Sequence, residues 1–160
     1  QVDWLDLNQV DNPKDDMRFR AADRGAAIFA RPEGIWYDKN YIYFTCTTGG
    51  AKKIGQVWKM HVADQTLEMM FESYSSDVMK KCDNITIAPW GDVIVCEDGR
   101  GRDRILGIKK NGETYVMAEN ILNSSEFAGV NFSPDGNILF VNIYSPTMTL
   151  AITGPWKGMT

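Results

Sequence analysis

Acidic and amide side chains recur in this chain at intervals that suit a shared cation site. Glu33, the pair Asp83 and Asn84, and Glu126 each stand near the start of an apolar segment, and these segments repeat every 45 to 50 residues. Carboxylate and amide oxygens are the ligands that Ca²⁺ prefers, about six to eight of them at about 2.3–2.6 Å. One such residue alone is typical of a solvated turn. Their repeated placement predicts a metal site.

Two further features carry charge near the same repeat. Glu97 and Asp98 follow the second apolar segment of the middle repeat and would add charge if that segment ends at the same edge. Residues 99–104 (GRGRDR) form the one basic cluster. This cluster suits either a flexible turn or a holder for an anionic substrate, because arginine presents a planar fork that matches phosphate.

Zinc and disulfide chemistry find little support in the sequence. His61 is the only histidine, and a zinc cage needs about four nitrogen or sulfur ligands. The three cysteines form an odd number without a CxxC motif, so they predict no disulfide pattern. They are Cys46, Cys82 and Cys96, and their places within apolar segments indicate packing.

The elements that must position these residues are short strands. Residues 32–46, 82–97 and 127–142 each consist of a small residue, an alternating apolar segment, a turn and a second apolar segment. Proline and glycine in the turns favour hairpins. Further alternating segments lie at 56–62, 67–71, 104–108 and 114–117, and Asn111-Gly112 predicts a primed hairpin turn. Four strands per repeat of this length are typical of β-propeller blades, with a β-sandwich as the alternative.

The predicted fold class is all-β, a partial propeller of four-stranded antiparallel blades within a single incomplete domain. Residues 31–74 and 82–120 make two blades, and residues 126–154 make an incomplete one. Residues 1–10 would be the last strand of a preceding blade, and residues 13–30 a helical or loop insertion. Propellers close with about four to eight blades, so we expect the N-terminal part of the propeller to lie outside this chain.

Composition limits the partners. The chain has a net charge of −4, whereas a protein that binds duplex nucleic acid usually shows a basic face. No apolar run approaches the roughly 18 residues of a membrane span. The first residues, QVDWLDL, lack the basic and apolar regions of a signal peptide.

Longer motifs resemble a known family in the expected order. These are residues 31–37 (RPEGIWY), 83–86 (DNIT), 96–99 (CEDG), 126–136 (EFAGVNFSPDG), 140–143 (FVNI) and 151–156 (AITGPW). Together they are similar to the C-terminal part of PhoX-family alkaline phosphatases, over residues 2–156.

The resemblance implies a six-bladed parent propeller with Ca²⁺ and Fe³⁺ at one channel mouth. It implies hydrolysis of small phosphate monoesters, and folded export by the twin-arginine route to the periplasm or medium. Arg31 would bind the substrate phosphate and Glu33 would bind metal. Further ligand candidates are Glu97 and Glu126, then Asp83 and Asn84. The iron-bound cysteine of the family would belong to the missing N-terminal part.

Two other functions remain open at this point. A calcium-dependent lactonase also uses acidic and amide ligands in a propeller channel. A propeller without catalytic activity would serve as a binding module. In either enzyme reading, we expect this fragment alone to be inactive because much of the metal shell is absent.

Overall fold

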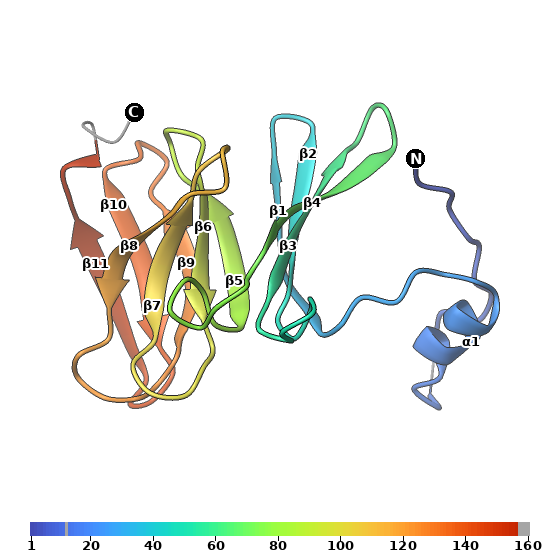
Figure 1. Cartoon of the computed structure of the whole chain (residues 1–160), viewed down its shortest axis with the longest axis horizontal. Coiled ribbons are helices and arrows are strands. Elements are labelled where there is room, and N and C mark those ends of the chain that lie inside the picture. The colour runs from blue at the N-terminus through green and yellow to red at the C-terminus, as the bar shows by residue number, and fades with distance from the viewer. Residues whose placement is uncertain (12, 157–160) are drawn as a thin grey trace.

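The computed structural model of the chain describes residues 1–11 and 13–156, and it is almost entirely β-structure (Figure 1). Three antiparallel sheets stand face to face, which confirms the predicted fold class. The first sheet contains β1 (Pro32–Asp38), β2 (Tyr41–Cys46), β3 (Gln56–His61) and β4 (Thr66–Glu72). The second contains β5 (Cys82–Ile87), β6 (Val93–Glu97), β7 (Arg104–Ile108) and β8 (Thr114–Glu119). The third contains β9 (Phe127–Phe132), β10 (Ile138–Ile143) and β11 (Met148–Thr153).

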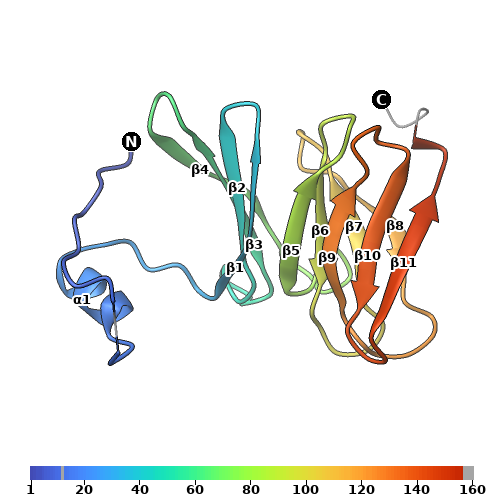
Figure 2. The same ribbon diagram turned by 180° about the vertical axis from the view of Figure 1, so that it is seen from behind.

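Each sheet is an antiparallel meander in which neighbours in sequence are neighbours in space. The first strands of the three sheets lie side by side, because β5 contacts both β1 and β9 (Figure 2). These strands form the inner edge of the three blades. The third sheet has three strands where the other two have four.

Two hairpin turns show where local sequence decides geometry. Lys39 and Asn40, between β1 and β2, both have positive φ, which is the pattern of a primed two-residue turn. At Asn111-Gly112 only Gly112 has positive φ, at 84°, and its N–H donates to the carbonyl of Lys109. The predicted primed turn at Asn111-Gly112 is therefore wrong, and the loop is a longer turn that ends in a left-handed glycine.

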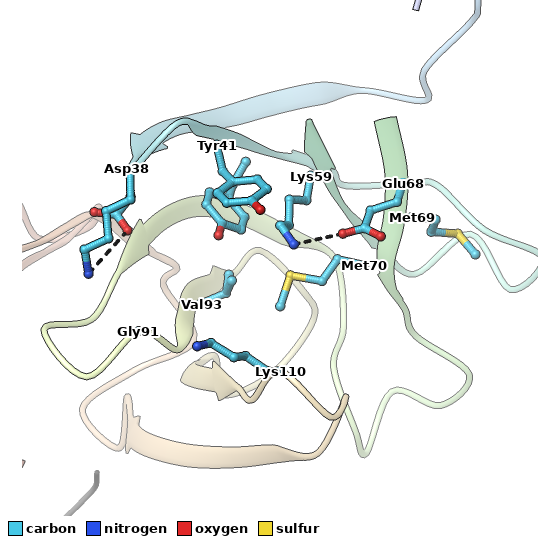
Figure 3. Close-up of a pocket in the computed structure, with 11 residues that line it drawn as sticks. Asp38, Tyr41, Lys59, Glu68, Met69, Met70, Gly91, Val93 and Lys110 are labelled. Carbon is cyan, nitrogen blue, oxygen red and sulfur yellow. Dashed lines mark hydrogen bonds and ion pairs between the residues drawn. The ribbon is translucent and has the colours of Figure 1, made fainter. Parts of the chain in front are cut away.

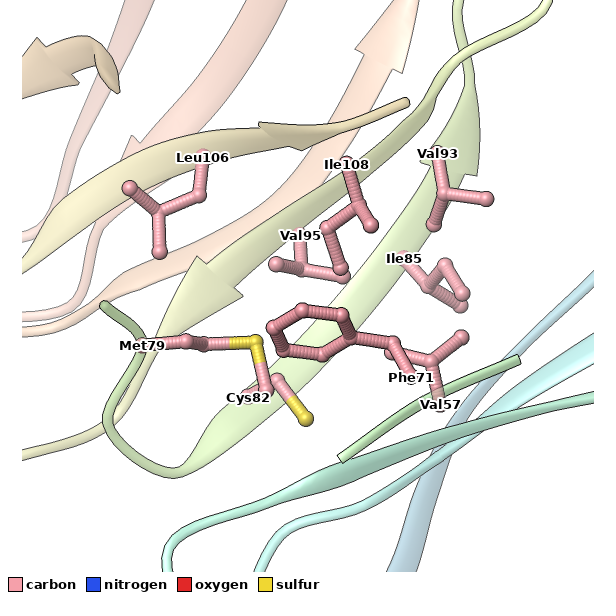
Figure 4. Packing of buried hydrophobic residues seen from close by; sticks show 9 residues of the cluster. All are labelled: Val57, Phe71, Met79, Cys82, Ile85, Val93, Val95, Leu106 and Ile108. Carbon is pink, nitrogen blue, oxygen red and sulfur yellow. The ribbon is translucent and has the colours of Figure 1, made fainter. Parts of the chain in front are cut away.

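Apolar side chains fill both spaces between neighbouring sheets. The nine buried residues between the first and second sheets are drawn in Figure 4 and include Val57, Phe71 and Leu106. The second cluster, between the second and third sheets, includes Ile94, Ile105 and Val141. Strand β6 contributes Val93 and Val95 to one cluster and Ile94 and Cys96 to the other, so all of its residues are buried.

The region before β1 differs from the sheets. Residues 1–11 form no strand, although the backbone N–H of Val2 donates to the carbonyl of Gln65 beside β4 at 2.6 Å. The helix α1 (Met17–Asp23) lies within the segment expected as an insertion. Within the described residues, no helix is long and apolar enough to cross a membrane.

Candidate metal and phosphate site

Carboxyl groups from all three blades gather where the inner strands begin. Glu33 and Asp83 lie on β1 and β5, Glu126 directly precedes β9, and Asp98 directly follows β6. We call these four residues the carboxylate cluster. Arg31, just before β1, is the cation that contacts it. Four of the six predicted site residues are thus brought together, namely Arg31, Glu33, Asp83 and Glu126. Asp98 was not among the predicted site residues.

Direct contacts connect the members of the cluster. The Arg31 guanidinium lies 2.5 Å from Glu33 Oε1 and 3.7 Å from Asp98 Oδ2. A hydrogen bond joins the carboxyls of Glu33 and Asp83, and another joins those of Asp98 and Glu126. Because Arg31 reaches both Glu33 and Asp98, it connects the two carboxyl pairs.

The titration of the cluster reflects crowded like charges. Burial, followed by the hydrogen bond with Glu33 and the charges of Glu126 and Asp98, raises the pKa of Asp83 to about 7. Burial and the contact with Asp98 also raise the pKa of Glu126. Burial alone would raise the pKa of Glu33, but hydrogen bonds with Asp83 and Arg31 lower it. Neighbouring carboxylates that cannot all ionise are typical of sites that bind cations or protons.

Backbone geometry recurs at the start of each inner strand. Arg31 and Lys81 have positive φ, at 51° and 48°, immediately before β1 and β5. The carbonyls of Arg31, Lys81 and Glu126 each accept a hydrogen bond from the residue that follows the second strand of the same blade. Glu126 is therefore equivalent to Arg31, two positions before the equivalent of Glu33. The residue of the third blade that is equivalent to Glu33 is Ala128. The expected equivalence of Glu126 and Glu33 is therefore wrong by two residues.

A bulge places the first side chains of each inner strand. In β1 the irregular pair is Glu33-Gly34 and in β5 it is Asp83-Asn84, while in β9 it lies one residue later. A bulge sets two residues against one and redirects their side chains. At this bulge the two adjacent residues make different contacts: Asp83 joins the carboxylate cluster, and Asn84 contacts the third blade.

Asn84 and Gly34 connect neighbouring blades. The side-chain oxygen of Asn84 accepts a hydrogen bond from the backbone N–H of Gly129 at 2.8 Å. Thr45 Oγ1 accepts from Gly34 N–H at 2.9 Å and donates to the carbonyl of Asp83 at 2.6 Å. A Cβ at Gly34 would collide with that same carbonyl oxygen, so the close approach of β1 and β5 requires glycine. Asn84 thus has a partner within the protein, and its role as a metal ligand stays a prediction.

Glu97 lies in a different environment from the cluster. Its side chain is 0% exposed, and its oxygens accept hydrogen bonds from the backbone N–H groups of Lys80 and Arg104. The Arg104 guanidinium adds two more, at 2.8 and 2.7 Å. All four contacts come from the protein itself. The structure does not bring Glu97 into the carboxylate cluster, and its assignment as a ligand stays a prediction.

The type of ligand atom in the carboxylate cluster suits a hard cation such as Ca²⁺. The cluster offers carboxylate oxygens only, and burial raises the pKa of Cys82 to about 12 and also raises the pKa of Cys96, which disfavours their thiolate forms. Among residues 1–11 and 13–156, however, no three carboxylate, thiol or imidazole groups converge as a metal shell. The cluster oxygens instead pair with one another and with Arg31.

A separate pocket of about 500 Å³ lies between the first two blades at the other end of the inner strands (Figure 3). It is lined by Tyr41, Lys59 and Lys110 among others, and an ion pair joins Lys59 to Glu68 at 2.9 Å. None of the predicted site residues lines it. The pocket is therefore distinct from the carboxylate cluster.

Comparison with known proteins separates fold from family. The chain is similar to the solved structure of virginiamycin B lyase from Staphylococcus aureus, a propeller, with 18% sequence identity and a TM-score of 0.50. This similarity shows the fold alone. It covers 78% of this chain but 41% of the lyase, so the chain spans less than half the length of that protein. A search of curated proteins gave no match.

The family is shown by a sequence model. The model of alkaline phosphatase PhoX matches residues 1–147, which include every blade strand up to β10 and all members of the carboxylate cluster. The match thus spans the residues whose motifs and geometry have been described. On this basis the chain belongs to the PhoX family of alkaline phosphatases.

Proposed function

We propose that this chain supplies part of the active site of a metal-dependent phosphate monoesterase. The observation that carries the proposal is the gathering of carboxyls from three successive blades at one end of the inner strands, where Arg31 contacts Glu33 and Asp98. Membership in the PhoX family gives the reaction class. The remaining blades of the complete propeller would close the ring around this site.

Within such a site Glu33, Asp83, Asp98 and Glu126 would hold the metal, with Ca²⁺ favoured by their oxygen donors. Fe³⁺ is expected only from the family. Bound metal ions neutralise charge on the phosphoryl group and activate an oxygen nucleophile. The carboxylates of this chain would fix where those cations sit.

Arg31 would bind the substrate phosphate. Its guanidinium is half-exposed and has no partner other than Glu33 and Asp98 among the described residues. A guanidinium can donate two parallel hydrogen bonds to phosphate oxygens while Glu33 holds its orientation. Arg31 would thus orient the monoester and stabilise negative charge that develops on the nonbridging oxygens.

Mutation of Arg31 and Glu33 tests this assignment. In the complete propeller, Arg31→Ala and Glu33→Ala are each expected to lower kcat/KM for p-nitrophenyl phosphate by about 100-fold or more, as for other lost charge-stabilising groups. Arg18→Ala is the control, because Arg18 is exposed and contacts Asp15 at 2.6 Å and the Phe19 ring on the helix α1 side of the chain, not the carboxylate cluster. Unchanged turnover in both site variants would contradict the assignment. Turnover of lactones but not phosphate esters would favour the lactonase alternative.

Chelation tests the metal requirement. Treatment of the complete propeller with EGTA is expected to abolish phosphatase activity and to lower Tm, because a ligand that binds only the folded state stabilises it. Added Ca²⁺ should restore both. If activity survives full chelation, verified by elemental analysis of the treated protein, the cluster is not a metal site. Export to the periplasm or medium stays a prediction from the family.

A further inference from the structure

The loop that carries Asp98 is fastened at both sides of that residue. The backbone N–H of Asp98 donates to the carbonyl of Lys81 at 2.9 Å. The next N–H, of Gly99, donates to Asp103 Oδ1 at 3.0 Å. Asp103 closes the same loop and is 1% exposed. The position of the Asp98 carboxyl therefore depends on a buried side chain five residues further along.

Lys80 holds this loop from within. Its Nζ lies 3.0 Å from Asp103 Oδ1 and donates to the carbonyls of Arg100 and Arg102 at 2.9 and 2.7 Å. An ammonium group has three donors, and all three are used here. Its aliphatic stem lies against Gly99, where any Cβ would collide with it. Lys80 is therefore committed to the loop and has no donor left for a substrate.

The ion pair between Lys80 and Asp103 is not arranged for stability alone. Asp103 Oδ2 is buried and, in the part of the chain that the structure describes, has no hydrogen-bond partner. A buried ion pair with an unsatisfied oxygen contributes little net stability, because desolvation opposes the attraction. The main effect of this ion pair is to fix the backbone path of residues 98–103.

We propose that Lys80 and Asp103 are positioning residues that hold Asp98 in the geometry needed for cation binding. This inference rests on the proposed function, which makes Asp98 a metal ligand. Groups that orient metal ligands typically change metal affinity 10–100-fold when they are mutated. Lys80 and Asp103 would act in this way through the loop backbone.

A purely electrostatic role and a positioning role of Lys80 predict opposite changes in Ca²⁺ affinity when Lys80 is replaced. Lys80 is therefore a sharper test than Asp103. If only charge matters, removal of the Lys80 cation should strengthen Ca²⁺ binding, because it removes the repulsion between two positive charges. Loss of an anchor should weaken Ca²⁺ binding. Lys80→Met keeps the aliphatic stem and removes the three hydrogen bonds.

The experiment compares Lys80→Met with Lys59→Met in the complete propeller. Lys59 also forms an ion pair, with Glu68 at 2.9 Å, but it lies in the pocket at the other end of the strands. Lys80→Met is expected to raise the Kd for Ca²⁺ about 10-fold or more by calorimetry and to speed hydrogen exchange at the Gly99 amide. Lys59→Met should change the Kd less than about 2-fold, since its charge lies far from the cluster.

Each outcome has a clear meaning. A Kd for Lys80→Met that is unchanged or lower, in protein that is folded, overturns the proposal. If the wild-type propeller binds no Ca²⁺, the proposed function fails, and hydrogen exchange at Gly99 still shows whether Lys80 orders the loop. If Lys80→Met does not fold, Asp103→Asn preserves the shape and is judged by the same two measurements.

Discussion

Replacing Glu97 by alanine is expected to lower the free energy of unfolding of this chain by about 3–5 kcal/mol. The substitution leaves the Arg104 guanidinium, whose side chain is 17% exposed, without its carboxylate. It also strips the backbone N–H groups of Lys80 and Arg104 of their acceptor. Removing one partner of a buried ion pair is costly because the other charge stays desolvated.

Urea denaturation of Glu97→Ala and Glu119→Ala provides the measurement and its control. Glu119 lies 3.6 Å from Arg102 at the surface, with 42% of its side chain exposed. Loss of such an exposed pair should change stability by about 0–1 kcal/mol. Equal losses in the two variants would show that Glu97 is not the buried anchor described. Ca²⁺ affinity of Glu97→Gln in the complete propeller would test separately whether Glu97 also binds metal.

The second large effect is expected in the packing between blades. Leu106 is 1% exposed in the cluster that the first and second sheets share (Figure 4). Leu106→Ala would leave a cavity there, and such substitutions cost about 2–5 kcal/mol. The destabilisation should appear as a lower denaturation midpoint in urea. It would show that contacts between blades, in addition to hydrogen bonds within them, hold the chain together.

The control for Leu106 is its cross-strand neighbour. Val116 pairs with Leu106 across β7 and β8 but is 53% exposed. Val116→Ala should therefore cost less than about 1 kcal/mol, the range of strand propensity. If Leu106→Ala also lowers the free energy of unfolding by less than about 1 kcal/mol, the two blades do not share a packed interface.

The fold could be predicted from the sequence because its signals are local. Alternation with a period of two, and turns built on proline, glycine and asparagine, mark each strand within a few residues of where it lies. The predicted strands at 104–108 and 56–62 match β7 and β3 within one residue. A turn at Asn111-Gly112 was predicted, but its primed type was wrong, because Asn111 Oδ1 accepts from Glu113 N–H at 3.1 Å and stabilises a longer loop.

The site was only partly predictable because it depends on register and on contacts distant in sequence. Adjacent residues at the end of a strand point in opposite directions. Glu97 consequently turns inward to Arg104, while Asp98 reaches the cluster. The sequence indicated that Glu97 and Asp98 add charge near the site, and only alternation counted from β6 could have separated their roles. Nothing local in the sequence indicates that Lys80 would contact Asp103.

The bulge repeated at the start of every inner strand has a consequence for how such rings diversify. In the first two blades the first residue of the bulge carries the carboxylate, and the bulge leaves that residue outside the regular pairing of the ladder. Glutamate occupies this position in the first blade and aspartate in the second, whereas in the third blade the bulge lies one residue later and the carboxylate comes from Glu126, just before the strand. New chemistry on this scaffold can therefore arise one blade at a time, by substitution rather than by refolding.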